Sequence, residues 1–147
     1  MPISSAPLAK KLMLKPGMKG LLLHAPAGFK LDVPKGATLA TRASAKTYDF
    51  GLAFAKDAKA LAKVAPALVG RMREDAMAWI AWPKKTGSIE TDLSRDGDWD
   101  ALWDTGWEGV SLVSLDDDWS AWRIRPSPKV KRNERALKAI AEREAKR

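Results

Sequence analysis

One histidine and two adjacent lysines are the side chains that most readily suggest ligand chemistry. His24 follows a short apolar run, and Lys84 and Lys85 follow a longer one. Histidine can act as a general base near neutral pH, and lysines beside hydroxyl donors can bind a phosphate or a carboxylate. If both runs are parallel strands, their carboxyl ends meet at one edge of the sheet, where open α/β sheets bind ligands. The predicted site for a small anionic ligand consists of His24, Lys84, Lys85, Thr86 and Ser88.

Each part of this predicted site has a simpler alternative. His24 could be a strand-end histidine bonded to backbone, and the lysines could belong to a solvated loop that lacks the paired glycines of a phosphate-binding loop. His24 is the only histidine, and the chain has no cysteine, which excludes disulfides, thiolate zinc sites and two-histidine metal sites. Without a nucleophile paired with a base, we expect no catalytic residue. A non-enzymatic binding or accessory protein is therefore our first interpretation.

Positive charge is concentrated at the two ends of the chain. The net charge is +8, with eight Lys or Arg against two acids in residues 1–55 and eight against three in residues 126–147. Such ends could give weak, salt-sensitive binding to nucleic acid or another polyanion, could contact a protein partner, or could simply be solvated. The tail residues available for nucleic acid are Lys129, Lys131, Arg132, Arg135 and Lys138. Interspersed glutamates favour an ordinary helix as the alternative.

Acidic residues and tryptophans gather in the middle of the chain. The acids between residues 90 and 118 could in principle bind calcium or magnesium, but they lack the calcium-loop spacing, so we expect a solvated face and no metal. The seven tryptophans could stack on bases or sugars. We expect most of them to fill the core instead, with one or two lining a cleft.

The apolar pattern predicts the strands that position these side chains. Residues 77–82 are typical of a central strand buried on both faces, with Trp79 and Trp82 on opposite sides. Further strands are expected at residues 18–24, 36–41, 48–54, 110–115 and 119–125. The last two strands flank the turn at residues 116–118 and form a hairpin.

Helices are expected between these strands. Asp57 caps one whose apolar residues recur at helical spacing from residue 61 to residue 72, and Pro66 either kinks it or starts a second helix. A polar turn is expected at residues 71–75 and a short helix at residues 8–14. Another short helix carries Trp99, Leu102 and Trp103, with Trp107 near its exit. It is capped by Ser94 or Asp96 and ends at Gly106.

This order of elements predicts an α/β fold with a mostly parallel, Rossmann-like sheet, flanking helices, a C-terminal β-hairpin and a helical tail. Residues 1–7 are expected to be disordered, residues 8–125 to form a single domain, and residues 126–147 to form a basic, helix-prone tail. No signal peptide and no apolar run of ~20 residues is present, so we expect a cytoplasmic protein without membrane contact.

Several short motifs follow one another in a recognisable order. They are Leu8-Ala-Lys-Lys-Leu12, Ala25-Pro-Ala-Gly-Phe29, Ala81-Trp-Pro-Lys-Lys85, Thr91-Asp-Leu93 and Asp118-Trp-Ser120. Together they resemble the small bacterial family catalogued as domain of unknown function 3052, over residues 8–125. The family has no established activity, so the resemblance implies no catalytic residue.

The order of strands and helices from residue 48 onward also resembles the C-terminal half of class I methyltransferases. Those enzymes bind their cofactor with a glycine-rich turn after the first strand and an acid at the end of the second. Here the first turn, at residues 24–28, holds one glycine, and the second strand ends near Thr41 and Arg42. We therefore expect no cofactor, and a degenerate methyltransferase-like enzyme remains an alternative.

Overall fold

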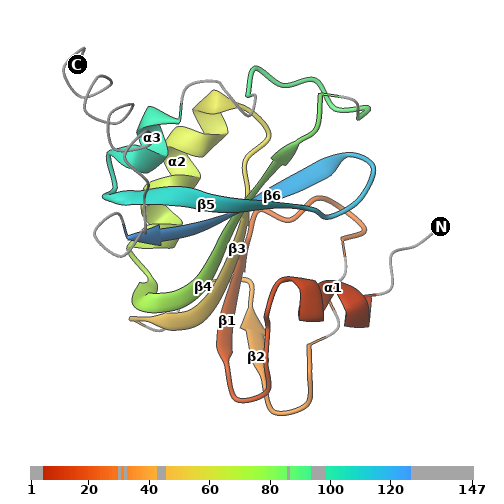
Figure 1. Cartoon of the computed structure of the whole chain (residues 1–147), viewed down its shortest axis with the longest axis vertical. Helices are drawn as coiled ribbons and strands as arrows, with labels where there is room; N and C mark the ends of the chain where they lie inside the picture. The colour runs from red at the N-terminus through yellow and green to blue at the C-terminus, as the bar shows by residue number, and fades with distance from the viewer. Residues whose placement is uncertain are drawn as a thin grey trace.

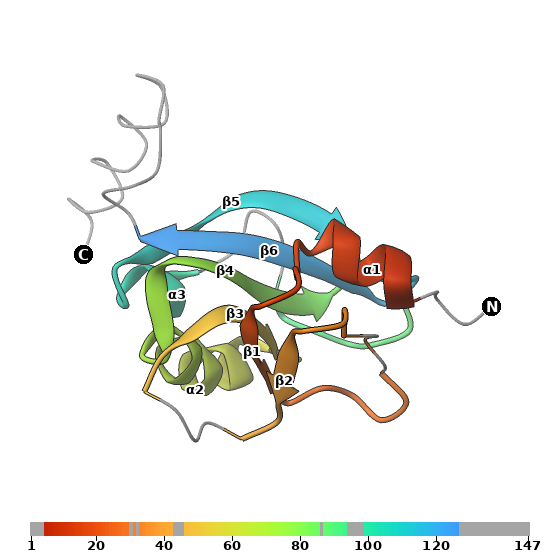
Figure 2. The ribbon, with the colours of Figure 1, turned by 90° about the horizontal axis from the view of Figure 1, so that it is seen from below.

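The computed structural model describes residues 5–29, 31, 33–42, 46–85, 87–93 and 99–126, which build a six-stranded sheet with helices on both faces (Figure 1, Figure 2). The strands are β1 (Lys19–Leu23), β2 (Thr38–Ala40), β3 (Tyr48–Phe54), β4 (Met72–Pro83), β5 (Trp107–Ser114) and β6 (Trp119–Pro126). Their order is β2-β1-β3-β4-β6-β5, with β1 to β4 parallel and β6 antiparallel to both β4 and β5. Helices α2 (Ala58–Val69) and α3 (Asp100–Trp103) lie on one face, and α1 (Ser5–Lys11) lies on the other. The predicted α/β class, mostly parallel sheet and C-terminal hairpin are confirmed.

Strand β4 is the centre of the sheet, because its apolar half lies between β3 and β6. Ala78, Ile80 and Trp82 are buried on the face covered by α2 and α3. Trp79 and Ala81 are buried on the opposite face, which α1 covers. The predicted central position and the opposite orientation of the two tryptophans are confirmed. Since burying one large apolar side chain is worth about 1.5–3 kcal/mol, β4 stabilises both cores.

The prediction of a polar turn at residues 71–75 is wrong, because β4 already begins at Met72. The register with β3 shifts between the pairs Tyr48↔Met72 and Phe50↔Met77, so β4 carries extra residues there. Such an irregularity lets the polar side chains of residues 73–75 stay exposed while the strand continues. Exposed polar residues within a strand resemble a turn in sequence.

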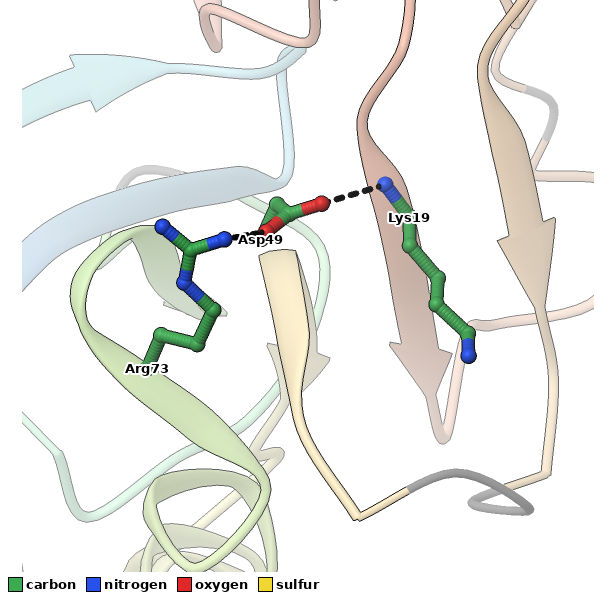
Figure 3. A network of polar contacts seen from close by, with 3 residues as sticks. All are labelled: Lys19, Asp49 and Arg73. Atoms are coloured by element: carbon green, nitrogen blue, oxygen red, sulfur yellow. Dashed lines mark hydrogen bonds and ion pairs between the residues drawn. The ribbon is translucent and has the colours of Figure 1, made fainter.

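Asp49 joins three strands at the amino-terminal edge of the sheet (Figure 3). Its Oδ2 accepts a hydrogen bond from the backbone N–H of Lys19 in β1 at 3.0 Å, and its Oδ1 lies 2.6 Å from Nη1 of Arg73 in β4. The Arg73 side chain is 58% exposed, so the ion pair contributes at most about 1 kcal/mol. These contacts therefore matter chiefly for the register of β1, β3 and β4.

Helix α2 begins after Asp57, whose carboxylate accepts a hydrogen bond from the backbone N–H of Ala60 at 2.8 Å. This N-cap and the apolar face of the helix were predicted from sequence. The buried residues of the helix are Leu61, Val64, Ala65 and Leu68. Pro66 lies inside α2, which continues to Val69, so no second helix starts there. Met72, expected on the helix face, belongs to β4 instead.

Helix α1 begins at Ser5 rather than at the expected Leu8. Residues 5–7, which were expected to be disordered, are therefore part of the helix. Leu8 and Leu12 are buried, in agreement with the predicted apolar face. The indole N–H of Trp79 donates to the carbonyl oxygen of Leu12 at 2.9 Å. This buried hydrogen bond ties the end of α1 to the central strand.

Helix α3 is a single turn that ends at Trp103, and the predicted caps Ser94 and Asp96 lie outside the described residues. The helix is capped at Asp104, so it ends before the predicted Gly106, which lies in the following turn with φ +85°. Trp107, expected at the exit of the helix, opens β5 instead. Strand β5 begins at Trp107, earlier than the expected residue 110, because Trp107 still pairs with Pro126 of β6.

The link between α1 and β4 can be tested with two matched tryptophan variants. Trp79→Phe leaves the buried Leu12 carbonyl without its donor, whereas the buried Trp82 indole N–H has no hydrogen-bond partner among the described residues. Both variants lose similar ring volume, so we expect Trp79→Phe to lower the free energy of unfolding by about 1–3 kcal/mol more than Trp82→Phe. Urea unfolding measures this difference, and equal losses would show that the hydrogen bond contributes nothing.

Candidate functional site

The direction in which strands are added to the sheet reverses between β1 and β3. The chain leaves β1 for β2 on one side and later enters β3 on the other side of β1. In open α/β sheets, the carboxyl ends of the two strands at such a reversal border the crevice where ligands bind. Here those ends are marked by His24 after β1 and by Lys56 after β3.

A cavity of about 290 Å³ lies at these strand ends, and we call it the switch-point cavity. Its apolar lining includes Phe54 at the end of β3, Val64 of α2 and Trp119 at the start of β6, all of them buried. Three exposed basic residues also line it: His24, Lys56 and Lys63. Among the described residues that line the cavity, none is acidic. The cavity therefore combines an apolar floor with a basic rim.

Three aromatic rings support the floor of the switch-point cavity. The ring centroids of Phe29 and Phe54 lie 4.9 Å apart, and those of Phe54 and Trp119 lie 5.0 Å apart, both pairs edge-to-face. Phe29 is positioned by a tight turn in which its backbone N–H donates to the carbonyl oxygen of Pro26 at 3.1 Å, with Gly28 at φ +84°. Edge-to-face packing fixes the rings relative to one another. The floor is thus built before any ligand arrives.

His24 leaves β1 with φ +57°, in the left-handed region. This conformation costs a non-glycine residue of order 1 kcal/mol and persists only where the surrounding structure imposes it. Here it carries the chain out of β1 and into the turn that holds Pro26, while the imidazole stays on the rim of the cavity. The structure therefore places His24 at the sheet edge predicted from sequence.

The amino terminus of α2 is already occupied by carboxylates of the protein itself. Asp57 accepts the hydrogen bond of Ala60, and Oδ1 of Asp92 accepts one from the backbone N–H of Ala58 at 2.7 Å. Those backbone groups are therefore satisfied within the fold. An anion in the neighbouring cavity would be bound by the side chains of Lys56, Lys63 and His24.

Lys84 and Ser88, which were predicted to bind the ligand, form hydrogen bonds to other residues of the protein. Nζ of Lys84 donates to Oγ of Ser114 at 2.5 Å, and Ser88 donates from both its backbone N–H and its hydroxyl to Oδ1 of Asp118, each at 2.8 Å. The backbone N–H of Lys84 also donates to the carbonyl oxygen of Asp118. These bonds attach the loop after β4 to the β5–β6 hairpin.

Lys85 and Ser88 line a second, more open depression of about 640 Å³ on the same edge of the sheet. Asp57, Glu90 and Asp92 line it too, so its lining carries more acid than base. The structure thus brings His24 and the loop of Lys84 and Lys85 to one edge but divides them between two hollows. Lys56, Lys63 and Trp119, which complete the switch-point cavity, were not selected from sequence.

The other predicted ligand residues fall in different places. Thr86 and the five tail residues assigned to nucleic acid lie outside the described residues.

In the part of the chain that the structure describes, no group of three or more acidic or histidine side chains could hold a metal ion. The tryptophans are buried or partly buried, and Trp119 also lines the switch-point cavity, in agreement with the expected role in the core. No helix of the described residues is long and apolar enough to cross a membrane.

Comparison with known proteins identifies no family. No family model matches this chain, and a search of curated proteins finds no match. Among solved structures, a ribosomal protein L11 methylase from Lactobacillus delbrueckii subsp. bulgaricus is similar at 14% identity and a TM-score of 0.49, over 83% of this chain and 78% of that chain. A likeness at so low an identity and TM-score assigns neither a family nor an activity to this chain. The resemblance to the domain of unknown function 3052 family stays a prediction.

Asp118 allows the attachment of the loop after β4 to be tested by pH. The backbone N–H of Ser88, and next its hydroxyl, lower the pKa of Asp118 below the ordinary value of 3.8. A carboxyl whose pKa is lowered by folding stabilises the folded state above its unfolded pKa, and this contribution is lost as the pH falls through the lowered pKa. We expect Asp118→Asn to lower Tm at pH 7 and to flatten the fall of Tm below about pH 4.

The matched control for this experiment is Asp117→Asn, in the same turn and exposed. It should keep the wild-type profile of Tm against pH. If both variants gave the same profile, the bonds between Ser88 and Asp118 would have no part in acid stability.

Proposed function

We propose that this protein binds a small anionic ligand in the switch-point cavity. The observation that carries the proposal is the convergence of Lys56, Lys63 and His24 around an apolar floor at the carboxyl ends of β1 and β3. The cavity volume, about 290 Å³, lies at the small end of ligand sites, which suits a metabolite rather than a polymer. The ligand would combine a phosphate or carboxylate with an apolar or aromatic portion.

The charge of the cavity supports this chemistry. Two ammonium groups and an imidazole on one rim, without an acid among the described lining residues, favour an anion over a cation. The rings of Phe54 and Trp119 offer apolar contact to the rest of the ligand. These features supply affinity and orientation, so the proposed function is binding without a reaction, in keeping with an accessory protein.

A methyltransferase-like enzyme is the alternative, and the rim opposes it. S-adenosylmethionine carries a sulfonium and an ammonium against one carboxylate, so its net charge is positive and a rim with Lys56 and Lys63 disfavours it relative to an anion. A ligand with phosphate groups avoids this repulsion.

A thermal-shift screen tests the proposal directly. We expect nucleoside phosphates or small phosphorylated or carboxylated metabolites to raise Tm at millimolar concentration, and S-adenosylmethionine to raise it less or not at all, because a ligand stabilises only the state that it binds. A shift with S-adenosylmethionine alone would favour the enzyme alternative. No shift with any compound, at concentrations far above a plausible Kd, would contradict the proposal.

The lysines of the rim can be separated from general surface charge by a matched pair on α2. Lys63→Ala removes a rim charge, whereas Lys59→Ala removes an exposed charge of the same helix that does not line the cavity. A hydrogen bond to a charged group is worth about 1.5–3 kcal/mol. We therefore expect Lys63→Ala to weaken the anion identified in the screen about tenfold or more, and Lys59→Ala to leave its Kd unchanged, by isothermal titration calorimetry. Equal effects of the two variants would place the ligand elsewhere.

A further inference from the structure

A second apolar hollow, of about 440 Å³, lies beside the end of α1 and the turn that leads into β1. The switch-point cavity adjoins the opposite end of β1, so the two hollows are separate. Its walls are formed by the end of α1 with the following turn and by residues 33–34. We call it the α1 groove, and the lining residues that matter below are Lys10, Met13, Leu14, Lys15, Val33 and Pro34.

Met13 occupies a position that normally favours glycine. Helix α1 ends with the backbone N–H of Met13 donating to the carbonyl oxygen of Lys10 at 3.1 Å and that of Leu14 donating to Ala9 at 2.9 Å. This is the Schellman pattern, in which the residue after the cap adopts a left-handed conformation. Met13 has φ +62° there, and the residue is 38% exposed. A strained residue that presents a large apolar side chain to solvent indicates a use for that side chain.

The two walls of the α1 groove are held together before any partner binds. The backbone N–H of Gly17 donates to the carbonyl oxygen of Gly36 at 3.1 Å, which joins the turn after α1 to the turn that holds Pro34. Leu14 is buried beneath the groove, and Met13 and Val33 are among the large apolar side chains that the described structure leaves exposed. A groove formed in advance costs little entropy to fill. Methionine suits it, because its flexible thioether adapts to different apolar partners.

The positive charge around the α1 groove favours a negatively charged binding partner. Among its described lining residues the charged side chains are Lys10 and Lys15, and Lys11 and Lys35 are exposed nearby in sequence. The C-terminal segment, residues 126–147, has eight Lys or Arg against three acids, so like charges would oppose its binding here. A second copy of this chain, with a net charge of +8, would be repelled overall by like charge.

We propose that the α1 groove binds an acidic segment of another protein. In that segment, one or two apolar anchor side chains would enter between Met13 and Val33, and flanking Asp or Glu residues would lie beside Lys10 and Lys15. An amphipathic helix laid into a groove is a common form of such recognition. This surface is independent of the anion site, because no lining residue is shared.

A displayed library of 16-residue peptides with randomised Leu, Met, Ala, Glu and Lys positions provides the probe. It is panned on the full chain, and the enriched peptides are measured by fluorescence anisotropy at several salt concentrations. We expect peptides rich in Glu around apolar anchors, with binding that weakens as salt rises. No enrichment, or enrichment of basic peptides, would overturn the proposal.

Met13→Gly is the decisive variant, because glycine removes the exposed side chain and relieves the positive φ together. We expect its Tm to equal or exceed that of the wild type while the selected acidic peptides lose at least tenfold in affinity. Lys15→Glu should also weaken these peptides, and Lys63→Ala, in the other cavity, should not. Unchanged affinity for Met13→Gly would place the peptides elsewhere.

Two further measurements separate the acidic segment from other occupants. The first is analytical ultracentrifugation of the wild type and of Met13→Gly. A dimer of the wild type together with a monomer of Met13→Gly would assign the groove to a second copy. The second is flotation of both proteins with phosphatidylserine vesicles. Binding of the wild type but not of Met13→Gly would assign the groove to a lipid surface. Either result would overturn the proposal, whereas a monomer that ignores vesicles and binds acidic peptides supports it.

Discussion

Strand β4 must bury both of its faces, and the rest of the structure depends on that requirement. Trp82 projects into the core beneath α2 and α3, while Trp79 projects to the other side, where its indole N–H reaches the end of α1. A two-sided strand needs a covering layer on each face and a neighbour along each edge. Helix α2 and helix α1 supply the two layers, and β3 and β6 supply the edges. The hairpin β5–β6 then closes the sheet on the side away from β1.

The same arrangement forms the switch-point cavity. Because β1 and β3 are neighbours although β2 lies between them in sequence, a crevice opens at their carboxyl ends. The turn after β1, the start of α2 and the first residue of β6 all border this crevice, which brings His24, Lys63 and Trp119 together. The loop after β4 ends at the same edge, but it is bound to the hairpin through Ser88 and Asp118. The basic rim thus comes from the turn after β1, from α2 and from the residues just before α2, and that loop does not contribute to it.

The two ends of β1 differ in character. At its carboxyl end lies a small cavity with a charged rim, suited to a metabolite. Before its amino end lies an apolar groove between lysines, suited to a segment of another protein. Helix α1 adjoins the groove and is tied to β4 by the bond from Trp79 to Leu12.

The sequence by itself determined the features that depend on local periodicity and composition. The continuous apolar run at residues 77–82 identified the central strand, helical spacing after Asp57 identified α2, and the hairpin followed from two strands around an acidic turn. The extent of β4 and β5 was missed, because a register shift hides exposed polar residues inside a strand and because Trp107 pairs with Pro126, far along the chain. Only the tertiary structure decided the site. Sheet order brought Lys56, Lys63 and Trp119 to His24, and hairpin pairing brought Ser114 to Lys84, since contacts between residues distant in sequence leave no periodic signal in the chain.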